Sequence, residues 1–224
     1  SVMSFGSGHE AGDSAGRQES RCACLLLLDT SEAMGRQRID MLNAGLMQFK
    51  QALYADPEAA KRVDIAIVTY GPVRTAIDFV AAESFYPPFL VSTVDAPLGA
   101  AIEQGLELIR QRKDAYTSRG LTYYRPWVFL IGAGAPSDSV KRAAELVREG
   151  EANKDFQFFA VGMEGADMDA LRQISVRAPL TLKGLQFPEL FSWLSSSMRA
   201  VVGSAPGDTV PLSNPTSADG WAAR

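Results

Sequence analysis

The chain has 224 residues, a length that suits one large α/β domain. Hydrophobic residues make up 46% of it and charged residues 21%, which is typical of a globular protein and argues against a disordered or membrane-spanning chain. Its formal net charge of -4 creates no field that would attract nucleic acid or anionic lipid, so we expect neither as a partner.

Both ends of the chain are rich in small and polar residues. We expect residues 1–20 to be a flexible segment and residues 203–224 to be a Pro-, Gly- and Ser-rich tail, with the folded domain over residues 21–202. Trp221 in the tail is either exposed or docks the tail onto the domain or onto a partner. Residues 1–20 lack the basic start and apolar run of a secretory signal, so we expect a cytoplasmic location.

Short β-type runs alternate with amphipathic helical patterns along the domain. The predicted strands are Cys22–Leu28, Val63–Tyr70, Val73–Phe79, Trp127–Ile131, Phe156–Val161 and a short one at Leu180–Leu182. Apolar residues at spacings of three and four predict helices around residues 39–53, 98–109, 140–147 and 190–201. This order predicts a doubly wound, mostly parallel α/β sheet flanked by helices, with residues 73–79 as the one antiparallel edge strand. Ligands of such sheets bind at the carboxyl ends of the strands.

The first predicted strand runs directly into Asp29, Thr30 and Ser31, which places one carboxylate and two hydroxyls at this edge. A phosphotransferase or hydrolase with Asp29 as nucleophile would also need a second acid two residues on, where Ser31 stands, and further acidic Mg²⁺ ligands. This enzyme interpretation is therefore an alternative rather than the main hypothesis.

A glycine pair follows the strand that begins at Trp127. Gly132-Ala133-Gly134 partly matches a phosphate-binding turn, but Ser137 stands where a third glycine is required. The simpler interpretation is a tight turn before a helix that Ser137 caps. A zinc site is not expected, because the chain has two cysteines and a single His.

Three segments resemble the von Willebrand factor A (vWA) family. LLLLDTSEAMG resembles the family's first strand and Asp-x-Ser-x-Ser loop, VDAPLGAAIEQGL resembles the segment that supplies a metal-binding Thr, and RPWVFLIGAGAPSD resembles the strand that ends in Thr-Asp-Gly. The similarity covers roughly residues 21–202. Within the family the chain resembles the TerY-type group of tellurium-resistance and stress-response clusters, and residues 211–222 are also similar to that group.

The resemblance implies a metal-ion-dependent adhesion site, but its ligand positions are incomplete. Asp29 and Ser31 match the first two positions, whereas Ala33, Ala96 and Ala133 replace the expected Ser, Thr and Asp. Methyl groups cannot coordinate Mg²⁺ or Mn²⁺, which require oxygen ligands. We therefore expect a degenerate site and no cofactor.

Acidic neighbours leave a second possibility open. Glu32, Asp95 and Asp138 lie near the vacated positions, and a small loop shift could bring Asp95 toward Asp29 to restore a two-carboxylate Mg²⁺ or Mn²⁺ site. Otherwise Asp29 and Ser31 are structural residues that accept hydrogen bonds from loop amides.

These observations predict a non-enzymatic protein-interaction module of a bacterial stress-response system, which binds partners without a metal bridge. The resemblance implies a protein kinase or phosphatase of the same pathway as the partner. The candidate contact residues are Thr30, Glu32, Asp95, Tyr123 and Tyr124, the last two because tyrosine is enriched at interface hot spots.

Overall fold

The computed structural model describes residues 20–224, so the flexible segment expected at the start of the chain lies almost entirely outside the described residues. Within this range the strands form one seven-stranded sheet with the order β3-β2-β1-β4-β5-β6-β7. The strands are β1 (Cys22–Asp29), β2 (Val63–Tyr70), β3 (Arg74–Ala81), β4 (Trp127–Gly132), β5 (Gln157–Gly162), β6 (Leu180–Leu182) and β7 (Ala222–Ala223). The α-helices are α2 (Gly35–Tyr54), α3 (Pro57–Arg62), α4 (Leu98–Ser118), α5 (Lys141–Ala152), α6 (Met168–Ile174) and α7 (Phe187–Val202). Two short 3₁₀ turns, η1 (Glu32–Met34) and η2 (Ala82–Ser84), follow β1 and β3. None of the helices between residues 20 and 224 has the length and apolar character needed to span a bilayer.

The expected doubly wound, mostly parallel α/β sheet is confirmed. β1 pairs in parallel with β2 and β4, and β5 pairs in parallel with β4 and β6. β3 is the expected antiparallel edge strand. The expectation of only one such strand was wrong, because β7 pairs antiparallel with β6 at the other edge. A two-residue strand has no side-chain period that the sequence could show.

Two short helices, α3 and α6, were not expected from the sequence. They have 6 and 7 residues, too few to show a long apolar stripe. Each begins at a capping carboxylate: Asp56 accepts hydrogen bonds from the amides of Glu58 and Ala59, and Asp167 accepts one from Ala170. These caps were the available sequence signal, because Asp before a short helical run is a common helix start.

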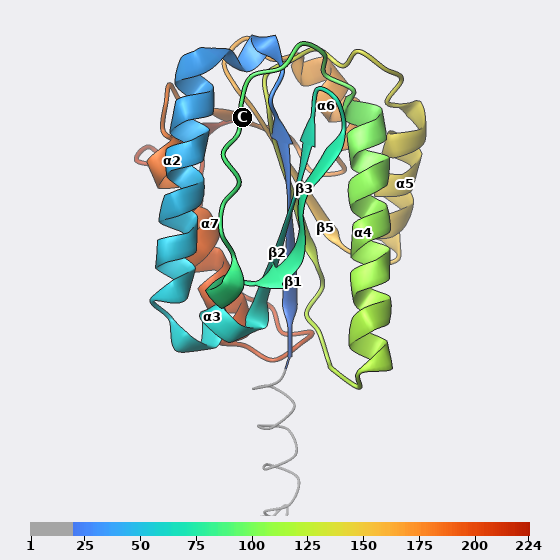
Figure 1. Ribbon diagram of the computed structural model, residues 1–224, viewed down its shortest axis with the longest axis vertical. Coiled ribbons are helices and arrows are strands. Elements are labelled where there is room, and N and C mark those ends of the chain that lie inside the picture. The colour runs from blue at the N-terminus through green and yellow to red at the C-terminus, as the bar shows by residue number, and fades with distance from the viewer. Residues whose placement is uncertain (1–19) are drawn as a thin grey trace, which may run out of the picture.

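β1 lies inside the sheet, between β2 and β4, and is buried on both faces. Its even-numbered residues from Cys22 to Leu28 pack in the core layer that contains the buried faces of α2 and α7. Its odd-numbered residues from Ala23 to Leu27 pack in the layer that contains those of α4 and α5. Figure 1 shows the two groups of helices on opposite sides of the sheet. Burial on both faces accounts for the unbroken apolar run in this strand.

The C-terminal tail returns to the domain and is anchored there by Trp221. This side chain is 3% exposed, and its ring centroid lies 5.7 Å from that of Trp193 on α7, in an edge-on arrangement. The Trp221 carbonyl accepts a hydrogen bond from the Lys183 amide at 2.9 Å. The Trp193 indole N–H donates to the Ser213 carbonyl at 2.8 Å, which fixes an earlier part of the tail. The tail therefore contributes to the core.

We expect Trp221→Ala to lower the free energy of unfolding by about 3 kcal/mol, because it removes a large buried aromatic side chain. Urea denaturation of the full chain measures this loss, and Trp221→Phe serves as the control that keeps most of the apolar contact. An unfolding free energy that does not change in Trp221→Ala would contradict a stabilising role for the tail.

The Cys22 thiol gives a second stability prediction. Burial raises its pKa from 9.0 to about 12, the Asp64 carboxylate adds to the rise, and the Arg62 guanidinium opposes it. Above pH 9.0 the unfolded chain loses this proton while the folded chain keeps it, so stability falls as pH rises toward about 12. We expect this thiol to contribute about 1.4 kcal/mol per pH unit to the fall. Urea titrations across this pH range should show a shallower slope for Cys22→Ala, and an identical slope would contradict the assignment.

Candidate functional site

The candidate site lies where the carboxyl ends of β1 and β4 meet. These strands are parallel neighbours, with Leu28 opposite Ile131, so the residues that follow them come to the same edge of the sheet. From β1 the chain proceeds outward to β2 and β3, and it then crosses through α4 to β4 on the other side of β1. Such a change of direction is the position where doubly wound sheets bind ligands. The topology thus brings the residues after β1 and β4 to the edge where we expect the site.

Asp29 ends β1, and its carboxylate is fully buried. Oδ1 accepts a hydrogen bond from the Ser31 amide at 2.7 Å. Oδ2 accepts two more, from the amides of Ala133 at 2.9 Å and Gly134 at 2.7 Å. Backbone amides that donate to a carboxylate form strong, charge-assisted hydrogen bonds. Asp29 therefore cross-links its own loop to the loop that follows β4.

Two glycines allow the loop after β4 to approach Asp29 this closely. A Cβ atom added at Gly134 would lie 2.8 Å from the Ser31 hydroxyl oxygen and 3.0 Å from the Ala96 methyl carbon. A Cβ atom added at Gly132 would lie 2.4 Å from the hydroxyl oxygen of Tyr70. The glycine pair thus serves close packing of the turn against Asp29.

The expected cap of the following helix was wrong. α5 begins at Lys141, and the amide of that residue donates to the hydroxyl of Ser139 at 3.3 Å, not to Ser137. The Ser137 amide donates instead to the Ala96 carbonyl at 2.9 Å, which joins this loop to the start of α4. The loop is longer than the sequence pattern indicated, so its first serine falls before the helix start.

Thr30 and Ser31 are buried beside Asp29. The Thr30 carbonyl accepts hydrogen bonds from the amide of Thr93 at 2.6 Å and from its hydroxyl at 3.0 Å, and the Thr30 hydroxyl lies 3.3 Å from the Tyr70 carbonyl. Contrary to expectation, Thr30 therefore faces its own chain rather than a partner. Thr93, which ties the Pro-rich loop before α4 to the site, belongs to no motif that could have identified it.

Tyr70 is the other residue at this edge that the sequence reasoning missed. It ends β2 beside Asp29 and is buried. Burial raises the pKa of its hydroxyl well above the ordinary value, and the negative charge of Asp29 raises it further. Tyr70 is therefore a neutral packing group here at physiological pH.

The acidic residues considered as replacement ligands do not gather around Asp29. Asp138 caps α4 instead, with its two carboxylate oxygens accepting hydrogen bonds from the amides of Gly99 at 2.9 Å and Ala100 at 2.8 Å. Glu32 and Asp95 are exposed. Among residues 20–224 no group of three or more His, Cys, Asp or Glu side chains is placed to hold a metal ion.

The donor set around Asp29 does not fit a divalent cation. Ala96 is buried close to Ser31 and Gly134, and Ala133 contributes only its amide, which donates to the carboxylate. Ala33 lies exposed in η1. The hydroxyl of Ser31 is buried and has no hydrogen-bond partner in the described part of the chain, but one hydroxyl cannot supply the oxygen shell that Mg²⁺ requires.

Tyr123 and Tyr124 lie at the amino ends of the strands, opposite the carboxyl edge. They precede β4, and Tyr123 forms a β-bridge with Arg21, just before β1. Tyr124 is 4% exposed, and its hydroxyl donates to the Ser204 carbonyl at 2.6 Å. Contrary to expectation, Tyr124 offers no exposed surface to a partner, because it packs under the start of the tail. Tyr123 is half-buried, so it alone of the pair reaches the surface.

Comparison with solved structures identifies the fold. The vWF domain of the type V pili tip protein Mfa5 from Porphyromonas gingivalis aligns with a TM-score of 0.59 at 10% identity, over 86% of this chain and 99% of that one. The fold is that of a von Willebrand factor A domain. No protein-family model matches the vWA-like chain, and no curated protein matches its sequence.

Two further structures contain a domain of similar fold as part of a longer chain. The pilus adhesin SpaC from Lactobacillus rhamnosus GG aligns with a TM-score of 0.59 at 12% identity, over 82% of this chain and 30% of that one. Proximal thread matrix protein 1 from the mussel byssus aligns with a TM-score of 0.51 at 14% identity, over 82% of this chain and 48% of that one. The chain thus spans about half of the mussel protein. At these identities the likeness shows the fold alone.

We expect Asp29→Asn to lower the free energy of unfolding by about 2–4 kcal/mol, because at least one buried amide loses its acceptor. Thermal melts with EDTA and with Mg²⁺ should show the same decrease in Tm, since the acceptors are lost in both conditions. Asp95→Asn, which changes an exposed carboxylate of the adjoining loop, should leave the Tm unchanged. A decrease that appears only with Mg²⁺ would instead make Asp29 a metal ligand.

Proposed function

We propose that this chain is a non-enzymatic protein-interaction module that binds its partner without a metal bridge. We further propose that it acts in the cytoplasm within a TerY-type bacterial stress-response system, with a protein kinase or phosphatase as partner. The fold supports the general role, because SpaC is a pilus adhesin and Mfa5 a pilus-tip protein. The similarity of residues 21–202 to the TerY-type group supports the specific setting.

The observation that carries the metal-free proposal is the hydrogen bonding of Asp29. Both carboxylate oxygens already accept hydrogen bonds from backbone amides, with N···O distances of 2.7 to 2.9 Å. A cation in the same position would compete with these N–H groups for the same lone pairs. Nearby methyl groups, including that of Ala96, replace the oxygen ligands that would favour the cation.

The same geometry argues against the two alternative functions. Asp29 is fully buried, whereas a phosphotransferase nucleophile must present an oxygen to its substrate. For Asp95 to complete a metal site with Asp29, its exposed side chain would have to turn inward. It would also have to displace amides that now donate hydrogen bonds to Asp29. Neither alternative gains support from the contacts of these two carboxylates.

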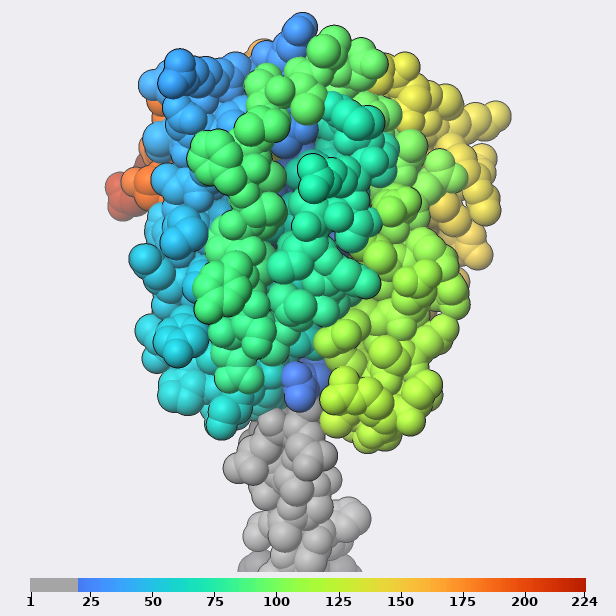
Figure 2. Space-filling view, viewed as in Figure 1, coloured from blue at the N-terminus to red at the C-terminus, as the bar shows by residue number. Residues whose placement is uncertain are grey.

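An exposed apolar loop beside the site supports partner binding. Residues 85–97 connect η2 to α4 and cross the front of the molecule between α2 and β3 (Figure 2). Tyr86, Phe89, Val91 and Val94 on this loop are 76%, 80%, 61% and 67% exposed. Several large apolar side chains exposed on one segment are typical of an interaction surface.

The loop also borders a cavity next to Thr30 that has both apolar and charged lining residues. A cavity of about 350 Å³ lies between the loop and β3, lined by apolar groups that include Phe89 and by the side chain of Arg74. This arrangement would receive an apolar side chain of the partner and place an acidic group near Arg74. Recognition would then depend on shape and on contacts from the loop.

We expect Mg²⁺ and Mn²⁺ to produce neither binding heat nor a shift in Tm with EDTA-treated protein. A ligand that binds only the folded state at one hundred times its dissociation constant would stabilise it by about 2.7 kcal/mol. We also expect the tagged chain to recover the same amount of partner from host lysate with EDTA as with Mg²⁺. Release of the partner by EDTA would refute metal-free binding.

Two matched variants test the loop in the same recovery assay. Phe89→Asp should reduce the recovered partner by about tenfold, as expected for an aromatic hot spot. Val176→Asp is the control, because Val176 is 58% exposed and lies between α6 and β6, away from the loop. Equal recovery with both variants would show that the loop is not the binding surface.

A further inference from the structure

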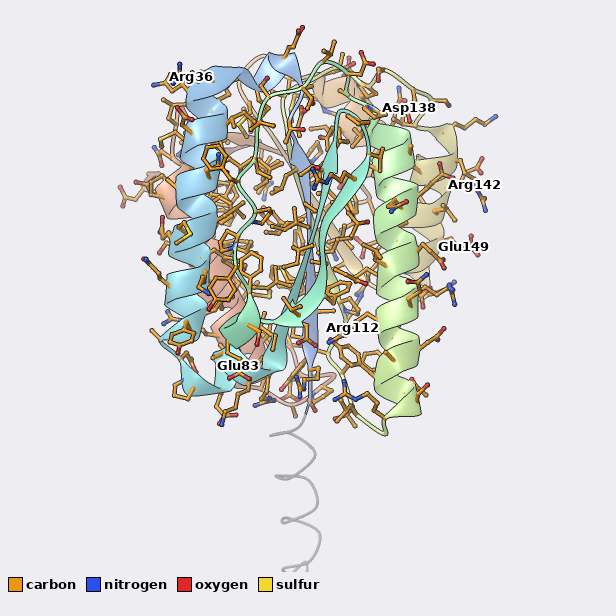
Figure 3. The ribbon with its side chains drawn as sticks, in the orientation of Figure 1. Arg36, Glu83, Arg112, Asp138, Arg142 and Glu149 are labelled. Carbon is orange, nitrogen blue, oxygen red and sulfur yellow. The ribbon has the colours of Figure 1, made fainter. Side chains whose placement is uncertain are left out.

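We propose a second interaction surface in the groove between α4 and α5, which binds a protein segment that carries lysine or arginine beside apolar side chains. The groove is separate from the carboxyl edge and shares no lining residue with the loop of residues 85–97. α4 and α5 run next to each other on one side of the sheet, and Glu149 projects from α5 on that side (Figures 1 and 3).

The floor of the groove is apolar. It has a volume of about 440 Å³ and is lined by Leu106 and Ile109 of α4, Leu146 of α5, Phe156 and Tyr123. The Tyr123 ring is held by Tyr116, with ring centroids 5.6 Å apart. A partner that placed apolar side chains on this floor would remove both surfaces from water, which is the main source of favourable binding free energy.

The rim of the groove is acidic. Its charged residues are Glu103, Glu107, Arg110, Lys113, Asp114, Glu149 and Asp155, so five are acidic and two basic. Both basic groups are already neutralised. Arg110 pairs with Glu107 at 2.6 Å and with Asp114 at 2.9 Å, and Lys113 pairs with Asp155 at 3.5 Å.

Five acids and two bases leave the rim with a net charge of −3, and Glu103 and Glu149 contribute most of it. They lie on opposite sides of the groove, Glu103 on α4 and Glu149 on α5, and neither forms an ion pair with a described residue. Lysine and arginine suit this site because their aliphatic stems pack on apolar surface while their charged ends reach outward. Charge complementarity thus selects a basic partner over an acidic one.

The length of the groove favours a polypeptide over a small amine. Its lining on α4 extends from Glu103 to Thr117, a helical distance of about 21 Å. The lining residues recur along one face of α4, so contacts are available over about four turns. A segment with several basic and apolar side chains would use this length, whereas a small polyamine would contact only the rim.

Fluorescence anisotropy with labelled synthetic peptides tests the proposal on the full chain. The probe is an amphipathic peptide of leucine and lysine, compared with its leucine–glutamate counterpart and with an oligolysine of equal charge. We expect the first peptide to bind at least about tenfold more tightly than either of the others, because only it matches both floor and rim. Equal binding of the oligolysine would overturn the proposal, since the floor would then play no part.

A charge-reversal pair gives the matched control. The double variant Glu103→Lys with Glu149→Lys should weaken binding of the leucine–lysine peptide at least about tenfold. Glu83→Lys with Glu189→Lys makes the same change of net charge at exposed acids outside the groove and should leave binding unchanged. Equal weakening by both pairs would overturn the proposal, as would displacement of the peptide by equimolar spermidine. Phe89→Asp should leave peptide binding unchanged, which separates this surface from the loop.

Discussion

The rest of the carboxyl edge depends on one buried carboxylate. Asp29 accepts hydrogen bonds from the amide of Ser31 on its own loop and from the amides of Ala133 and Gly134 on the loop after β4. These hydrogen bonds hold the two loops together. A buried charge is costly unless its oxygens are hydrogen-bonded, and here backbone donors replace the solvation that water or a cation would provide. Close approach of the second loop in turn requires glycine at position 134, where a Cβ would meet Ser31.

This arrangement explains why Ala96 and Ala133 are compatible with a well-packed edge. An adhesion site of the family type needs oxygen ligands that converge on a cation, which keeps the loops apart by the size of the coordination shell. Here a Cβ added at Gly134 would lie only 3.0 Å from the Ala96 methyl carbon, so the loop after β4 packs closely against Ala96 and Asp29. Of the buried side-chain polar atoms at this edge, only the Ser31 hydroxyl lacks a hydrogen-bond partner among the described residues.

Elements long enough to show a repeating side-chain pattern were predicted from the sequence, whereas elements of only a few residues were missed. The strands at Cys22–Asp29 and Val63–Tyr70 were foreseen within one residue, because both are buried along their whole length and are rich in apolar residues. β7 was missed because a two-residue strand depends on tertiary pairing alone. At the site, the residue types already showed alanine at the three positions where the resemblance implies oxygen ligands. The amide donors to Asp29 and the burial of Tyr124 were not visible there, because both depend on how separate loops pack.

An edge that satisfies its own polar groups shifts recognition to surfaces with unmet apolar or charged groups. The loop of residues 85–97 exposes large apolar side chains next to the edge, and the groove between α4 and α5 joins an apolar floor to uncompensated acids. The two surfaces lie on different elements and share no lining residue, so each can be altered by substitutions that leave the other unchanged. Because the groove uses charge and the loop mainly apolar contact, salt would weaken binding at the groove far more than at the loop. The fold can therefore present two partners with separately adjustable affinities on one rigid sheet.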